Sequence, residues 1–249
     1  MKVVVLGNQA SFPKAGHHHT SLLVSDNNTN VLFDIGPGTN SQFQKYISFT
    51  KLDAIFITHM HMDHVLDLPT LTFAVYMYNS LRGGNIKIPV YVPPGGMSFI
   101  NELLEVLDAI EYKTSIKIIE LNEEVYVGSM KVSFSEMNHN VPTYGYRVDS
   151  KEGKSITYSG DTAYTQNLIR LAENSDALFT EATLFHKDVS PRIKHLSAFQ
   201  AGEIAKLARV KKLFLVHLWH EYDENKLLEE AKRAFPHAEI AKEGEIITI

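Results

Sequence analysis

The segment THMHMDH, residues 58–64, constrains this chain more than any other part of the sequence. Only 12 of the 249 residues are histidine, so three histidines and an aspartate within six positions are unlikely to be a chance grouping. The metal-ligand types in the segment are His59, His61, Asp63 and His64. A catalytic zinc site needs three protein ligands and one open position. Four candidates in one segment therefore suggest two metal ions, with further ligands supplied from elsewhere in the chain.

The local backbone of this segment is also predictable. The apolar run Ala54–Thr58 is typical of a strand, and side chains two residues apart on a strand point the same way. His59 and His61 are therefore expected to face one site, with Met60 and Met62 turned toward packing. A helix is expected to begin just beyond, at the aspartate of the motif.

Short apolar runs rich in Val, Ile, Phe and Tyr recur along the chain, bounded by Gly, Pro, Asn or Asp, as strands are. These runs are Lys2–Leu6, Thr20–Val24, Val31–Phe33, Ala54–Thr58, Val90–Val92, Ile116–Leu121, Val125–Met137, Tyr144–Val148, Ser155–Ser159, Ala177–Thr180, Lys212–Val216 and Glu245–Ile249. Helical periodicity is found in Ser98–Leu107, Thr165–Ala172, Ala198–Ala208 and Lys226–Phe235. We expect one domain over residues 1–249: two sheets packed face to face with helices outside, a four-layer αββα sandwich. A three-layer α/β domain satisfies the same layer rules.

Composition narrows the chemistry and the partners. The chain has no cysteine, so a metal ion must be held by nitrogen and oxygen ligands. The net charge of −5 argues against a general nucleic-acid or membrane-surface binder, which normally carries a basic excess. No apolar run approaches the ~18 residues of a membrane span. The N-terminal residues 1–7 are expected to form a strand and not a signal peptide. A cytoplasmic location is the default expectation.

Three later residues are further ligand candidates because each lies at the end of an apolar strand. His139 follows the run ending at Met137, Asp161 follows Ser155–Ser159, and His217 follows Lys212–Val216. A single polar residue at a strand end is a weak signal. Three of them, together with the histidine motif, predict a common site at one edge of the sheets.

With these pieces in place, the chain resembles the metallo-β-lactamase fold superfamily and, within it, the ribonuclease Z group of phosphodiesterases. The matching pieces are Asp34-Ile35-Gly36, the histidine motif, His139, Ser159-Gly160-Asp161-Thr162 and Leu215-Val216-His217. The resemblance implies the αββα sandwich. It also implies two divalent metal ions bridged by Asp161, one held by His59, His61 and His139, the other by Asp63, His64 and His217. Zinc fits these ligands, and manganese is compatible.

The resemblance also implies two residues with supporting or catalytic roles. His195 precedes a helix that leads to the last ligand strand, as does a histidine of similar phosphodiesterases that stabilises phosphate charge or protonates the leaving oxygen. Without such a role it would be only a neighbour of a helix cap. Asp63 is expected both to bind metal and to orient or deprotonate the nucleophile. Asp34 is expected to orient a metal-bound histidine, as carboxylates commonly do.

The substrate expectation follows from departures from the ribonuclease Z pattern. Ribonuclease Z proper usually inserts a tRNA-gripping arm between the counterparts of His139 and Asp161, where this chain has only 21 residues. Asp67 stands where many relatives have glycine. We therefore expect a small phosphodiester or a short nucleic acid as substrate. By analogy with similar proteins, we also expect a homodimer. Hydrolysis of a lactone, thioester or other carboxylic ester, tRNA 3′ processing, and a non-hydrolytic metal sensor are the alternatives.

Two other histidine groups are left open by the sequence. His17, His18 and His19 lie in the loop after the first strand, which is expected to be solvated, with an overhang above the site as the alternative. His220 follows His217 by three residues and either lines the pocket or has no role.

Overall fold

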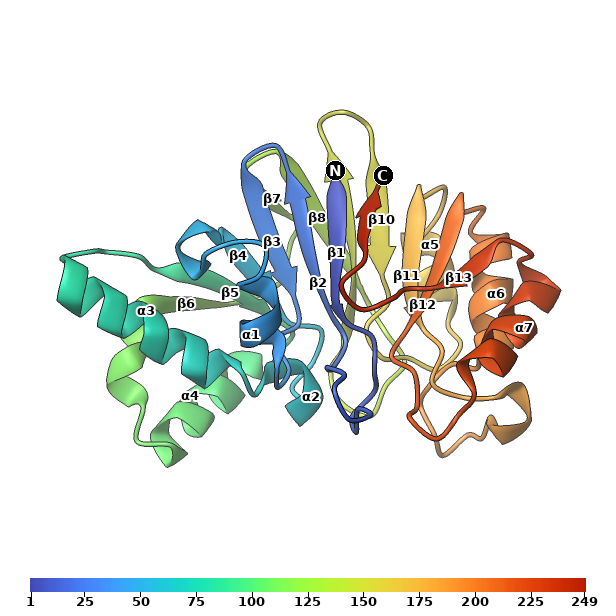
Figure 1. Ribbon diagram of the computed structural model, residues 1–249, viewed down its shortest axis with the longest axis horizontal. Coiled ribbons are helices and arrows are strands. Elements are labelled where there is room, and N and C mark those ends of the chain that lie inside the picture. The colour runs from blue at the N-terminus through green and yellow to red at the C-terminus, as the bar shows by residue number, and fades with distance from the viewer.

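The computed structural model describes residues 1–249 and contains two seven-stranded β-sheets that lie face to face, with helices on both outer faces (Figure 1). The first sheet has the order β14 (Ile246–Thr248), β1 (Lys2–Gly7), β2 (Ser21–Asp26), β3 (Thr29–Phe33), β4 (Ala54–Phe56), β5 (Ile88–Val92) and β6 (Ile116–Glu120). The second sheet has the order β13 (Ala238–Ile240), β12 (Lys212–Val216), β11 (Ala177–Glu181), β10 (Ser155–Tyr158), β9 (Tyr144–Ser150), β8 (Met130–Glu136) and β7 (Val125–Val127).

Each sheet has its own set of covering helices (Figure 1). The helices beside the first sheet are α1 (Thr39–Phe43), α2 (Met62–Val65), α3 (Leu68–Arg82) and α4 (Gly96–Val106). Those beside the second sheet are α5 (Gln166–Leu171), α6 (Ala198–Leu207) and α7 (Glu224–Ala234). Three short 3₁₀ helices are Phe49–Lys51, Ile110–Ser115 and His186–Asp188. No helix combines the length and apolar character that crossing a membrane requires.

The core forms three apolar layers because strand side chains alternate between two faces. On β1, Val3 and Val5 face the second sheet, while Val4 and Leu6 belong to the layer under the helices of the first sheet. The central layer joins residues of both sheets, and a third layer lies between the second sheet and its helices. The predicted four-layer sandwich is thereby confirmed, and a three-layer domain is excluded.

The longest helix, α3, was not expected from the sequence. Its 15 residues include several β-branched and aromatic side chains, and only Leu68, Leu71, Thr72 and Val75 are buried, so no clean apolar stripe marks it. The local signals for its ends are a proline in the first turn and Gly83 in the left-handed conformation after the last residue.

The run Val125–Met137 is not one strand but two, and β13 was also not expected. Strands β7 and β8 pair antiparallel across a turn at Gly128, whose φ of 55° is readily adopted by glycine.

Strand directions explain why the candidate site residues meet. β8 and β10 both run antiparallel to β9, while β10, β11 and β12 are mutually parallel. The carboxyl ends of these four strands therefore lie at the same edge of the second sheet. The chain after β4 meets this edge directly, since the Tyr144 amide donates to the Thr58 carbonyl at 3.0 Å.

The two sheets are also joined by a buried hydroxyl. Tyr146 is fully buried on β9, and its hydroxyl donates to the carbonyl of Ile57, at 2.7 Å, just before the histidine motif.

Tyr146→Phe removes the donor and leaves a buried acceptor short of a partner, so we expect the free energy of unfolding to fall by about 1–3 kcal/mol in urea denaturation.

Tyr91→Phe is the matched control, because Tyr91 packs against the same central layer and its hydroxyl has no hydrogen bond to protein. It should shift stability by less than about 0.5 kcal/mol. Equal effects of the two substitutions would mean that the bond to Ile57 does not fasten this segment.

Candidate metal centre

The histidine motif brings its first two rings together at the end of β4. His59 Nε2 lies 2.9 Å from His61 Nδ1, and His61 is the N-cap residue of α2. Met60 packs against the apolar layer under α4, as expected. Met62 does not: it lies in the first turn of α2 and is 65% exposed. The expectation for Met62 was wrong because the chain turns into the helix there, which ends the strand alternation.

A first group of donor atoms combines the motif with two residues of the second sheet. His59, His61, His139 and Asp161 place one ligand atom each within 4.8 Å of one another. His139 Nε2 lies 3.2 Å from His61 Nδ1, and Asp161 Oδ2 lies 3.7 Å from His59 Nε2. Three imidazoles and a carboxylate form a set that suits zinc.

A second group consists of Asp63, His64 and His217, whose ligand atoms also lie within 4.8 Å of one another. Asp161 faces this group as well, because its Oδ1 lies 3.3 Å from His217 Nε2 and 3.6 Å from His64 Nε2. The two oxygens of one carboxylate thus point to different donor groups. This is the arrangement that a bridging ligand requires.

Asp34 fixes the orientation of two of these rings. It is fully buried at φ 60° and accepts from His64 Nδ1 at 2.8 Å and from the Thr58 hydroxyl at 3.0 Å. A carboxylate only accepts, so the His64 proton sits on Nδ1 and Nε2 faces the site. The Thr58 hydroxyl, having donated to Asp34, accepts from His59 Nδ1 at 3.0 Å, which leaves His59 Nε2 as the ligand atom.

Glu181 orients histidine rings from the second sheet, as Asp34 does from the first. It was not identified from the sequence. This buried residue at the end of β11 accepts from His195 Nδ1 at 3.0 Å and from the Thr183 hydroxyl at 2.6 Å. Thr183 in turn lies 2.9 Å from His217 Nδ1. The available signal was the one used for Asp161, an acidic residue at the end of an apolar strand.

His195 lies at the open side of the site. Its side chain is 22% exposed, and its Nδ1 lies 3.9 Å from Asp161 Oδ2. Burial opposes the charged imidazole, but the Glu181 carboxylate outweighs it and raises the pKa of His195 to about 9. The preceding residue, Lys194, accepts from His139 Nδ1 at 3.0 Å through its carbonyl, so one loop positions both histidines.

The electrostatics of the cluster favour a cation. Burial works against a charged His64, yet Asp63, Asp34 and Asp161 together hold its pKa well above the ordinary value. Burial alone would raise the pKa of Asp63, but His64 and His217 keep it low, so the carboxylate stays ionised. A divalent ion competes with a proton for the same Nε2 lone pair and brings more charge to the carboxylates.

Two buried atoms support the same conclusion. His64 Nε2 and Asp161 Oδ1 have no hydrogen-bond partner in the protein. Buried polar atoms are rarely left unpaired. A metal ion between the two donor groups would give both atoms a partner. The candidate ligand atoms are all nitrogen or oxygen, which suits a divalent ion.

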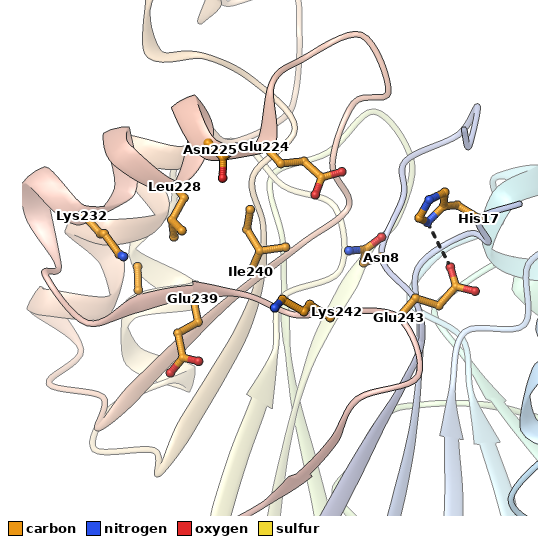
Figure 2. A pocket seen from close by; sticks show the side chains of 11 residues that line it. Asn8, His17, Glu224, Asn225, Leu228, Lys232, Glu239, Ile240, Lys242 and Glu243 are labelled. Carbon is orange, nitrogen blue, oxygen red and sulfur yellow. Dashed lines mark ion pairs between the residues drawn. The ribbon is translucent and has the colours of Figure 1, made fainter. Parts of the chain in front are cut away.

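The loop carrying His17, His18 and His19 is only partly solvated. His18 Nδ1 forms an ion pair with Glu243 at 2.5 Å, and His17 faces the same carboxylate (Figure 2). His19 is 9% exposed and lies beside Gly36, where an added Cβ would contact both His19 and the Asp63 carbonyl. The expectation of a solvated loop holds for His17, which is exposed, whereas His18 is half-buried against Glu243 and His19 is buried beside the segment carrying Asp63.

The pocket next to this loop is separate from the donor groups. It measures about 570 Å³ and lies between His17, α7 and the segment from β13 to Glu243 (Figure 2). None of the candidate metal ligands lines it. His220 belongs to neither donor group and packs against Phe12, with ring centroids 5.0 Å apart.

Two departures from the ribonuclease Z pattern have structural explanations. Asp67 precedes α3, and its carboxylate accepts from the Asn40 amide at 2.8 Å, which ties α3 to α1. Between His139 and Asp161 the chain forms only the β9–β10 hairpin, with register Ser155 to Asp149 and Tyr158 to Tyr146.

Residues 29–218 match the β-lactamase superfamily domain. The chain is 30% identical to ribonuclease Z of Listeria monocytogenes, with 97% of both chains covered. It is 28% identical to the probable metallo-hydrolase YhfI of Bacillus subtilis, with 98% of both covered. The crystal structure of that YhfI protein matches with a TM-score of 0.91 over 99% of this chain and 98% of the other. The short form of human tRNase Z, 23% identical, has the same fold with a TM-score of 0.80, over 100% of this chain and 99% of the other.

The chain therefore belongs to the β-lactamase superfamily, and its fold is that of the metal-dependent hydrolases. Divalent metal ions go with this fold, and the histidine and aspartate groups are placed to hold them. The alignment with the Listeria ribonuclease Z runs over 305 positions, whereas that with YhfI runs over 247. Because this chain has 249 residues, the ribonuclease Z contains segments that have no counterpart here.

Metal content gives the first test of the centre. We expect two divalent ions per chain by elemental analysis of protein purified without chelator, and we expect Asp161→Ala to lower this more than any other single ligand change. Loss of a bridge leaves both ions under-coordinated and close together. One ion or fewer in the unsubstituted protein, with none gained on adding metal, would contradict a two-metal centre.

Asp34→Asn tests the positioning network. The substitution turns one acceptor oxygen into an NH₂ donor. That donor then faces either the Thr58 amide N–H at the Oδ1 position or the Thr58 hydroxyl and His64 Nδ1 at the Oδ2 position, so we expect metal affinity to fall roughly 10- to 100-fold in competition with a chelator. Asp53→Asn is the control, because Asp53 accepts from the Asn30 amide at an exposed site outside both donor groups. Equal metal affinity in the two variants would mean that Asp34 does not position the metal ligands.

Proposed function

We propose that this protein is a dinuclear zinc phosphodiesterase acting on small phosphodiesters or short nucleic acids. The observation that carries the proposal is the position of His195 on the open side of the centre, beside Asp161 and held by Glu181. A histidine there suits a reaction whose leaving oxygen needs a proton. The similarity to ribonuclease Z supports the same class of reaction.

The proposed ligand sets follow the two donor groups. One ion would be held by His59, His61 and His139 and the other by Asp63, His64 and His217, with Asp161 available to both. Bound there, the ions would activate water and neutralise the charge of a phosphoryl oxygen.

The protein's own groups then orient the substrate and move protons. His195 donates from Nδ1 to Glu181, which leaves Nε2 as the atom that transfers a proton to the leaving oxygen. Asp63 stays ionised and can orient the attacking water through its carboxylate. Glu181 keeps the His195 ring in place, so it acts as a positioning residue.

Residues 1–249 are proposed to act as one catalytic domain, because His59, His61, Asp63 and His64 follow the first sheet while His139, Asp161 and His217 follow strands of the second. A homodimer is proposed as the working assembly. Sedimentation analysis at several concentrations checks the assembly state.

His195→Ala should separate catalysis from metal binding. We expect metal content to be unchanged and turnover of bis(p-nitrophenyl) phosphate to fall about 10²–10⁴-fold, the usual range for a general acid. His195 also lies within ligand distance of Asp161 and His217. Loss of a metal ion in this variant would make it a ligand instead, and unchanged turnover would remove the main support for a phosphodiesterase.

A substrate panel separates the phosphodiesterase from an ester hydrolase on the same centre. We expect bis(p-nitrophenyl) phosphate to be hydrolysed with a higher kcat/KM than a lactone or a thioester. The reverse order would assign the centre to carboxylic esters, and no hydrolysis by the metal-loaded protein would favour a sensor.

Precursor tRNA is expected to be a poor substrate. The chain carries a net charge of −5 and has only a short hairpin between His139 and Asp161. A protein that grips a polyanion through many phosphates loses affinity steeply with salt. We expect a higher kcat/KM for a small cyclic or aryl phosphodiester than for precursor tRNA. Efficient tRNA cleavage with a steep salt dependence would contradict this.

A further inference from the structure

Three aromatic side chains gather immediately beyond the candidate ligand His217. Trp219 and His220 follow it in sequence, with ring centroids 4.4 Å apart. Phe12, from the loop between β1 and β2, meets His220 edge-on at 5.0 Å and an interplanar angle of 63°. Phe12, Trp219 and His220 are called the aromatic rim below.

Backbone hydrogen bonds tie the aromatic rim to Leu218, the residue that follows the candidate ligand His217. Leu218 is buried; its amide donates to the Asn8 carbonyl at 2.9 Å, and its carbonyl accepts from the Ala10 amide at 3.0 Å. The loop that carries Phe12 is therefore bonded to the residue between His217 and Trp219. Trp219 and His220 lie two and three residues after His217, and the Leu218 hydrogen bonds limit how far the rim can move from that ligand.

Two side chains of the aromatic rim, Phe12 and Trp219, are at least partly exposed to solvent. Phe12 is 65% exposed although it lies in a loop held by backbone hydrogen bonds. Trp219 is partly exposed, and its Nε1 donates to Glu221 at 3.3 Å. His220 Nδ1 is buried without a hydrogen-bond partner, so ring packing and not hydrogen bonding holds that imidazole.

We propose that the aromatic rim stacks a planar ring carried by the substrate, a nucleobase or an aryl group attached to the scissile phosphodiester. The inference rests on the proposed phosphodiesterase function and names its substrate class. Three rings beside the centre are too small a surface for a stable protein interface, which buries about 1,200–2,000 Å². They match one flat ring, and stacking contributes about 1–3 kcal/mol per base. The donor groups of the metal centre would hold the phosphate at the same time.

Trp219 is the single tryptophan of the chain, so its fluorescence reports on the rim directly. The zinc-loaded protein is titrated with adenosine 5′-monophosphate and with ribose 5-phosphate, which has the phosphate but no base. We expect saturable quenching by the nucleotide and, by calorimetry, a dissociation constant roughly 5- to 160-fold lower than that of ribose 5-phosphate, the range for stacking of one base.

Phe12→Ala should erase most of this preference while leaving ribose 5-phosphate binding unchanged. Phe12→Leu keeps an apolar side chain without a ring and should lose the preference as well. Tyr126→Ala is the matched control and should change nothing. Tyr126 is 69% exposed on β7 and pairs with Lys131 at the start of β8, whereas the candidate ligand His139 follows the opposite end of β8. All three variants must retain the metal content of the unsubstituted protein.

Equal binding of the two ligands, or a preference that survives Phe12→Ala, would overturn the aromatic rim as a recognition surface, even if phosphodiesters are hydrolysed. A nucleotide preference that depends on Phe12 would support the rim. Should bis(p-nitrophenyl) phosphate not be hydrolysed in that case, only the phosphodiesterase assignment would fail.

Discussion

The buried carboxylate of Asp34 is the interaction on which the arrangement of the centre depends. It follows β3 of the first sheet and accepts from Tyr158 of the second sheet at 2.8 Å. It also accepts from the Thr58 amide at 2.7 Å and from His64 at 2.8 Å. A carboxylate buried in this way is tolerated only when its oxygens are fully used. The bonds that satisfy Asp34 hold the sheets together and set the rings for ligation.

Glu181 repeats this arrangement from the other sheet. Each sheet ends in a buried carboxylate that accepts from a threonine hydroxyl, and each threonine contacts the Nδ1 atom of a candidate ligand, His59 or His217. Asp161 lies between the two donor groups with one oxygen toward each. The centre is therefore assembled only when both sheets are in place, which couples metal binding to the packing of the sandwich.

The four-layer fold was predictable because strand runs have short, strong signals and because the motif pieces occur in one order along the chain. His139, Asp161 and His217 could be identified because each follows an apolar strand. The structure brings them next to the histidine motif. Glu181 was not distinguished from other acidic strand ends, because its role depends on residues distant in sequence. It contacts His195, 14 residues on, and Thr183, which in turn contacts His217 another 34 residues on.

Helix α3 escaped prediction because its exposed face carries Phe73, Tyr78 and Leu81, so burial and hydrophobicity do not coincide along it. The burial of His18 and His19 was not predictable for a related reason. Their burial depends on Glu243, more than 220 residues away in sequence, and on the close approach of Gly36, neither of which leaves a local pattern.

Anomalous X-ray scattering at the zinc edge, from crystals of protein purified without chelator, tests the central claim most directly. Two peaks roughly 3.5–4 Å apart are expected, with the Asp161 carboxylate between them and His195 bound to neither. A single peak, or a peak coordinated by His195 in place of His217, would contradict the proposed centre and the role given to His195.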